Sequence, residues 1–154
     1  MRESVTAYLA LGANLGDPVA GVRKAMTDIA ALDGITLLQR SSLYRSAPLE
    51  SSGPEYINAV VEVASLLSAP ALLAALQRIE QNAGRERPYH HAPRTLDLDL
   101  LSYGSATIYS ATLVLPHPRM YDRAFVLLPL SEIAPLRVTA AQLQAVRSQA
   151  IVRI

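Results

Sequence analysis

Two helical stripes of apolar residues interrupt a series of strand-like segments, and this order limits the fold more than any other feature of the chain. Each stripe recurs every three or four residues, as expected for a helix that buries one face. Asp17 and Ser68 precede the stripes and can cap the two helices. The apolar positions of the stripes are Val19, Val22, Met26, Ile29, Leu72, Leu76, Ile79 and Ala83. The sequence therefore predicts two amphipathic helices.

Strand-like segments flank both helices. The clearest alternation places Ile57 and Val61 on one face of a strand, with Tyr56 and Asn58 on the other. The predicted strands are Val5–Leu11, Ile35–Arg45, Tyr56–Ser65 and Leu96–Tyr103. The order βαββαβ predicts an α+β, ferredoxin-like sheet with both helices on one face.

The pattern weakens after Tyr103. We expect C-terminal additions there, namely a short hairpin, a helix around Asp122–Leu130 and a helix from Ala140. The chain has 154 residues and its turn signals do not indicate a linker, so we expect residues 1–154 to form a single domain.

Composition excludes several classes of protein. The 14 basic and 13 acidic residues leave a net charge of +1, too little for the basic field of a general nucleic-acid binder. The absence of cysteine excludes disulfides, a thiolate nucleophile and cysteine zinc sites. No apolar run reaches the ~18 residues of a membrane span, and the N-terminus lacks the features of a secretory signal. These features fit a cytoplasmic protein, and we also expect a monomer. The composition itself says nothing about activity.

The segment Leu96–Leu101 alternates leucine with aspartate. A period of two places Asp97 and Asp99 on one face of the predicted strand. Aspartate is disfavoured in strands and like charges repel, so a bound cation would offset a real cost. Magnesium suits such a pair, because it binds one or two carboxylates together with substrate phosphates. The alternative is an edge strand whose charges prevent aggregation.

A basic loop comes directly before this pair. Arg85, Arg87 and Arg94, with His90 and His91, accompany a single acid in this connection. Arginine side chains match phosphate oxygens, so the loop and the aspartates together favour a magnesium–nucleotide site. A solvated basic loop without function is the alternative.

Other common catalytic motifs are absent. The chain has no P-loop, no dinucleotide-binding fingerprint, no G-x-S-x-G elbow and no H-x-x-x-H zinc spacing. Two further places could recognise a planar substrate. Tyr56 and Asn58 offer a ring beside an amide, and Leu115–Phe125 holds His117 between two prolines, with Arg123 shortly after. Each place is also compatible with an ordinary structural role.

Six stretches of the chain, in order, resemble the 6-hydroxymethyl-7,8-dihydropterin pyrophosphokinase family. They are AYLALGANLGDP, SSLYRSAPL, PEYINAVVEV, QRIEQNAGRERP, APRTLDLDLL and LPHPRMYDRAFVLLPLSEIAP. The resemblance covers nearly the whole chain and implies a ferredoxin-like fold. It also implies an enzyme that transfers diphosphate from ATP to the hydroxymethyl group of the pterin and releases AMP.

The resemblance further implies roles for individual residues. Asp97 and Asp99 match the family's magnesium ligands, for which we expect two ions, and Arg85 and Arg94 match catalytic arginines. The positions that match the ATP site are Gln77, Glu80, Arg87, Arg94, Leu100, His117 and Arg123. The positions that match the pterin site are Ser46, Ala47, Leu49, Tyr56, Asn58, Asp97 and Phe125.

The chain departs from the family pattern at two places. Residues Pro88–Ala92 stand where other bacterial members carry an arginine and a tryptophan, and Pro118 stands where tyrosine is frequent. No side chain is an obvious general base. Two other functions compete with this interpretation: a ferredoxin-like RNA-binding module and a metal-dependent phosphohydrolase. The near-neutral charge and the single phenylalanine weigh against the first.

Overall fold

The computed structural model describes residues 3–48, 54–84 and 96–154. Its centre is an antiparallel sheet of six strands. These strands are β1 (Val5–Ala13), β2 (Ile35–Arg40), β3 (Tyr44–Ser46), β4 (Tyr56–Ser65), β5 (Asp97–Tyr103) and β8 (Ile151–Arg153). They lie in the order β5-β1-β4-β3-β8, and β2 pairs with β4 at the other end of that strand. The fold is therefore mixed α and β around one antiparallel sheet.

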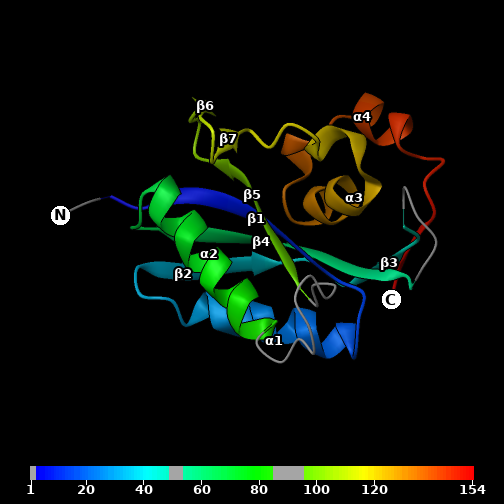
Figure 1. Ribbon diagram of the computed structural model, residues 1–154. Coiled ribbons are helices and arrows are strands. Elements are labelled where there is room, and N and C mark those ends of the chain that lie inside the picture. The colour runs from blue at the N-terminus through cyan, green and yellow to red at the C-terminus, as the bar shows by residue number, and fades with distance from the viewer. Residues whose placement is uncertain (1–2, 49–53, 85–95) are drawn as a thin grey trace.

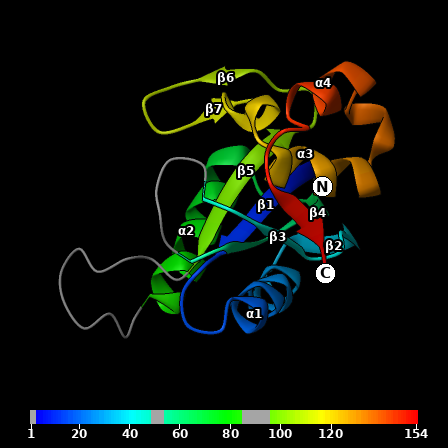
Figure 2. The same ribbon diagram turned by 90° about the vertical axis from the view of Figure 1, so that its right-hand side faces the viewer.

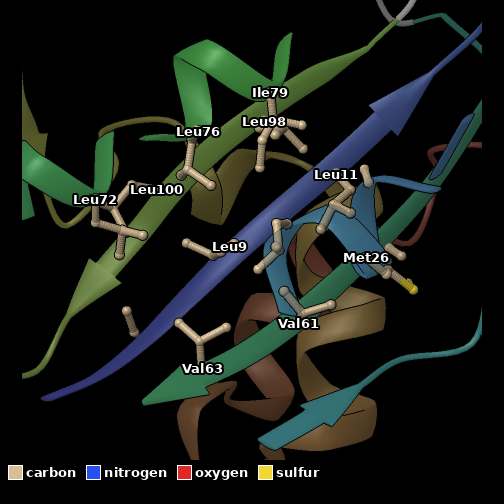
Figure 3. Close-up of a cluster of buried hydrophobic side chains, with 14 of the residues drawn as sticks. Leu9, Leu11, Met26, Val61, Val63, Leu72, Leu76, Ile79, Leu98 and Leu100 are labelled. Carbon is tan, nitrogen blue, oxygen red and sulfur yellow. The ribbon is translucent and has the colours of Figure 1, made fainter. Parts of the chain in front are cut away.

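Two helices cover one face of this sheet, as Figure 1 shows. They are α1 (Pro18–Ala30) and α2 (Ala69–Ala83), and the predicted caps are confirmed, because Asp17 and Ser68 accept hydrogen bonds from backbone N–H groups of the first turns. In Figure 3 the leucines of α2 pack over the inward leucines of β1 and β5. The predicted stripes are buried except for Val19, which is half-buried, and Ala83, which is exposed at the end of α2.

The C-terminal third covers the opposite face. It contains a small hairpin of β6 (Ile108–Tyr109) and β7 (Val114–Leu115), the 3-10 turns η1 (Met120–Asp122) and η2 (Pro135–Arg137), and helices α3 (Ala124–Ile133) and α4 (Ala140–Ala145). A second core forms here between α3 and the sheet, with Val60, Leu101 and Leu127 fully buried. The hairpin and both helices match the predicted additions, although α3 begins and ends later than expected. Across the described ranges no helix is long and apolar enough to cross a membrane.

One carboxylate ties α3 to the sheet. Glu132 accepts hydrogen bonds from the Tyr44 hydroxyl at 2.7 Å and from the Ser42 N–H and hydroxyl at 2.9–3.1 Å. Burial raises the pKa of Glu132, but these hydrogen bonds, together with the charge of Arg153, outweigh it and bring the pKa below its ordinary value. Burial and the same contact raise the pKa of Tyr44 to about 12. Glu132 thus fixes α3 on the face where the cavity described below opens.

Two strand predictions need correction. The segment Ile35–Arg45 is not one strand, because β2 ends at Arg40 and β3 starts at Tyr44, and Ser41 between them accepts a hydrogen bond from Val60 N at 2.9 Å. The first strand continues two residues beyond Leu11, through Gly12, because this stretch pairs with neighbours on both sides. The short β8 was not predicted.

Candidate active site

Three neighbouring strands form the floor of the site. Gly12 of β1 pairs with Asp97 of β5 on one side and with Asn58 of β4 on the other. Two residues back along β1, Ala10 pairs with Asp99. Antiparallel register therefore places Asp97, Gly12 and Asn58 in one row, on the sheet face that α1 and α2 leave uncovered.

The two aspartates emerge on the same side of β5, as predicted. Asp97 is exposed and Asp99 half-buried, whereas the alternate residues Leu98 and Leu100 are buried in the core under α2. Both carboxylates line one cavity of about 590 Å³, which we call the main cavity. The geometry that the metal hypothesis requires is thus present.

The edge of β5 is fixed by α2. The Glu80 carboxylate oxygen Oε2 accepts a hydrogen bond from Leu98 N at 2.8 Å. Because β5 is the outermost strand, this N–H has no neighbouring strand to bond, and a side chain takes that place. Leu98 lies between Asp97 and Asp99, so Glu80 holds the backbone from which both aspartates project.

A second wall of the main cavity comes from β3 and β4. Ser46 and Asn58 are both buried, and the Ser46 hydroxyl donates to Asn58 Oδ1 at 2.6 Å. This bond turns the amide so that Nδ2 points toward Gly12, where an added Cβ would lie 3.2 Å from it. Half-buried Tyr56 and Phe125 line the same cavity. The arrangement suits a flat ring with polar edges.

The residues just before α3 supply positive charge. The Arg123 guanidinium carbon lies 5.4 Å from the centre of the Phe125 ring. Arg123 Nε is buried and has no hydrogen-bond partner within the part of the chain that the structure describes. Arg119 lines the same cavity. A buried guanidinium nitrogen of this kind fits an anionic ligand such as a phosphate.

A smaller hollow of about 300 Å³ adjoins the main cavity and shares Asp99 with it. Leu100 and His117 line this hollow. Arg119 N donates to His117 Nδ1 at 3.2 Å. Burial lowers the pKa of His117, the Asp99 carboxylate partly opposes this effect, and Arg123 and Arg119 reinforce it. At neutral pH the imidazole is therefore neutral, with its proton on Nε2.

Most predicted site residues thus meet in one place. Those that line the main cavity are Ser46, Ala47, Tyr56, Asn58, Gln77, Glu80, Asp97, Asp99, Arg123 and Phe125. Predicted residues Leu49, Arg85, Arg87 and Arg94, and the histidines at 90 and 91, lie outside the described residues. Lining residues that the sequence did not single out are Ala10, Leu11, Gly12, Pro48, Leu73, Leu98 and Arg119. For Arg119 the only sequence signal is its place two residues after His117.

The chain is similar to several known proteins. The family model described as 7,8-dihydro-6-hydroxymethylpterin-pyrophosphokinase matches residues 8–135. A Haemophilus influenzae protein named 2-amino-4-hydroxy-6-hydroxymethyldihydropteridine pyrophosphokinase is 45% identical over 131 residues, which cover 84% of this chain and 82% of the relative. A Bacillus subtilis protein of the same name is 39% identical over 128 residues, 82% of this chain and 77% of the relative.

Solved structures share the fold at low identity. A crystal structure described as HPPK-DHPS in complex with substrates matches with a TM-score of 0.71 at 13% identity, over 95% of this chain and 43% of that chain. Wild-type HPPK-DHPS of Plasmodium falciparum with SDX-DHP matches with a TM-score of 0.67 at 12% identity, over 86% of this chain and 41% of that chain. This chain therefore spans less than half the length of these solved chains.

Proposed function

The chain belongs to the 7,8-dihydro-6-hydroxymethylpterin-pyrophosphokinase family, and we propose that the main cavity is where it carries out the family's reaction. That reaction transfers diphosphate from ATP to the hydroxymethyl group of 6-hydroxymethyl-7,8-dihydropterin in folate synthesis and releases AMP. One observation carries the proposal, the row formed by Asp97, Gly12 and Asn58. Neighbouring strands lie about 5 Å apart, so the backbones of Asp97 and Asn58 are roughly 10 Å apart. The Asp97 carboxylate suits a metal–phosphate group, and the Asn58 amide suits the edge of a ring.

Asp97 and Asp99 are the residues that would hold magnesium, and we propose two ions. The donor set fits, because two carboxylates share one face and the residues opposite them, Gly12 and Ala10, are small. Within the described ranges no group of three or more His, Cys, Asp or Glu side chains could hold a metal by itself. An ion held by Asp97 and Asp99 would complete its coordination with substrate phosphates and water. When bound, magnesium would neutralise phosphate charge and make the hydroxymethyl group more acidic.

The nucleotide is proposed to lie along α2, the start of α3 and the smaller hollow. Arg123 would donate to phosphate oxygens and stabilise negative charge as it builds toward the AMP oxygen. Neutral His117 would donate from Nε2, because its Nδ1 already accepts from the backbone. Gln77 and Glu80 lie on the α2 side of the main cavity, and Leu100 adds an apolar surface to the hollow.

The pterin is proposed to lie against the β3–β4 wall. Tyr56 and Phe125 would stack on its faces, and Asn58 Nδ2 would donate to its edge while Ser46 holds the amide in place. This position would turn the hydroxymethyl group toward Asp97. In-line attack then depends on the spacing of the two walls rather than on a general base.

We also propose a single domain and a ferredoxin-like topology. Residues 1–154 form one domain, an assignment supported by two cores that pack on the same sheet. The order β5-β1-β4-β2, with α1 and α2 on one face, supports a ferredoxin-like topology for the core. The monomeric state and the cytoplasmic location stay predictions.

Product analysis tests the reaction. The protein is incubated with ATP, magnesium and 6-hydroxymethyl-7,8-dihydropterin, and nucleotides are separated by chromatography. We expect AMP in step with loss of the pterin alcohol and no AMP without pterin. Formation of ADP alone, or hydrolysis of ATP that does not depend on pterin, would indicate the phosphohydrolase alternative instead.

Substitution tests the proposed metal ligands. Asp97→Ala or Asp99→Ala should lower kcat at least about a hundredfold, because each removes charge stabilisation at the reacting phosphates. The thermal midpoint should change little, since neither side chain is in a core. Asp33→Ala, an exposed aspartate in the turn between α1 and β2, is the matched control. Near-normal turnover in either variant would contradict the metal role.

A further inference from the structure

The last residues of the chain contact both walls of the main cavity. The match to the family model ends at residue 135, and the segment Gln149–Ile151 lies beyond it. In Figure 2 this segment, in red, passes beside α3 before it joins the sheet as β8, next to β3. A part of the chain outside the matched range therefore adjoins the proposed substrate site.

The Gln149 side chain makes hydrogen bonds to the backbone on both sides of Arg123. Its Oε1 accepts a hydrogen bond from Ala124 N at 2.9 Å, and its Nε2 donates to Asp122 O at 2.8 Å. The first N–H groups of a helix need partners from outside the helix, and Arg123 at the N-cap of α3 supplies none from its own side chain. One amide from a distant part of the chain thus fixes the short stretch that carries Arg123 and Phe125.

The next two residues hold the facing wall. Ala150 O accepts a hydrogen bond from Ala47 N at 3.2 Å, and Ile151 pairs with Ser46 in the ladder between β3 and β8. Ser46 is the residue whose hydroxyl orients Asn58. Three consecutive residues therefore connect the Arg123–Phe125 wall to the Ser46–Asn58 wall.

We propose that Gln149 is a positioning residue for the transfer reaction, which sets the spacing between these two walls. This inference rests on the proposed function. The Gln149 amide accepts one of its two hydrogen bonds and donates the other, so it can make both only in one orientation. This orientation fixes where α3 starts. The two following residues connect Gln149 to β3, through the hydrogen bond from Ala47 N to Ala150 O and the pairing of Ile151 with Ser46. Gln149 does not line the cavity and acts through Arg123 and Phe125.

The test is Gln149→Met, which keeps side-chain length and removes both hydrogen bonds. Gln142→Met is the matched control, because Gln142 also belongs to the C-terminal region and accepts from Thr139 N at 2.9 Å in the capping box of α4, away from the cavity. Steady-state kinetics are measured well below the thermal midpoint of each variant, and the Kd of the pterin is measured with magnesium and a non-hydrolysable ATP analogue. Amide exchange at Ala124 is followed by NMR.

For Gln149→Met we expect kcat/KM for the pterin to fall roughly ten- to a hundredfold, with a higher KM and Kd and faster exchange at Ala124. A merely structural role would reduce the active fraction, which lowers apparent kcat and leaves KM unchanged. Gln142→Met should keep KM within twofold. The inference is overturned if the pterin KM and Kd of Gln149→Met stay within twofold of wild type, or if Gln142→Met raises them equally. Wild-type protein that forms no AMP would overturn the proposed function, and this inference with it.

Discussion

A single methyl group at Gly12 should damage the site, although Gly12 itself touches no reacting atom in the proposed mechanism. Gly12 lies in β1 between Asp97 and Asn58, and a Cβ there would meet Asn58 Nδ2 at 3.2 Å. Such a contact is a few tenths of an ångström too short, so one partner must move. Asn58 is only 4% exposed, and its Oδ1 is held by the Ser46 hydroxyl at 2.6 Å. The amide therefore has little room to move.

Two opposing terms set the expected change in the free energy of unfolding for Gly12→Ala. Overpacking of a buried contact costs about 1–3 kcal/mol, and replacing glycine by alanine returns about 0.4–1 kcal/mol by restricting the unfolded chain. Gly12→Ala should therefore lower the free energy of unfolding by about 1 kcal/mol, or a few degrees in the thermal midpoint. In the proposed pterin site, displacement of Asn58 Nδ2 should cost about one hydrogen bond to the pterin, which would raise the Kd roughly five- to tenfold.

Gly21→Ala is the matched control. Gly21 lies inside α1, and a Cβ there would meet only the Ala13 Cβ, at an ordinary 3.9 Å. Alanine in a helix interior is favoured over glycine by about 0.5–1 kcal/mol, so this variant should gain stability. Urea unfolding and pterin titration with a non-hydrolysable ATP analogue measure both effects. The reasoning is refuted if Gly12→Ala binds pterin as wild type does, or if both substitutions shift stability in the same direction.

Three further predictions concern single contacts. Glu80→Gln should keep kcat within a few-fold of wild type, because its amide oxygen can still accept from Leu98 N. Glu80→Ala should lower kcat about tenfold. An equal loss of kcat in both variants would instead favour a role for the negative charge of Glu80. Gly104→Ala should lower the free energy of unfolding by about 1–2 kcal/mol in urea titrations, because φ is +54° and the new Cβ would lie 2.8 Å from Val5 Cγ1; unchanged stability would contradict this. Glu132→Gln should be less stable than wild type at pH 7, and the gap should close as the pH falls below about 4, because a carboxylate with a lowered pKa loses its contribution when it is protonated. A gap that stays constant down to pH 3 would show that the charge of Glu132 contributes nothing.

The sequence predicts those parts of the fold that depend on local periodicity. The strand Tyr56–Ser65 is predicted to the residue, because ten alternating positions leave one register of apolar side chains. The shared face of Asp97 and Asp99 follows from the same period of two. The family resemblance implies most of the remaining cavity residues. The family match also bears out the predicted pyrophosphokinase function. It gives no support to the two alternatives, an RNA-binding module and a phosphohydrolase.

Contacts between distant parts of the chain are not visible in local patterns. The strand β8 has only three residues, and what stabilises it is β3, more than a hundred positions earlier. Gln149 is one of several glutamines near the C-terminus, and nothing in its neighbours marks it as the cap of α3. Arg119 gives no periodic signal because it lies in a turn.

Gly12 shows how local propensity and tertiary pairing conflict, and why the outcome matters for the site. The sequence G-A-N-L-G indicates a loop, since glycine is unfavourable in strands, yet β1 continues through Gly12 because β4 and β5 bond it from both sides. Only this continuation brings Asp97 and Asn58 into one row, and only the missing side chain leaves the row open to a ligand. A larger residue would make a better strand and would close the path between the carboxylates and the amide. The weak point of the strand is thus what allows the two proposed substrates to meet.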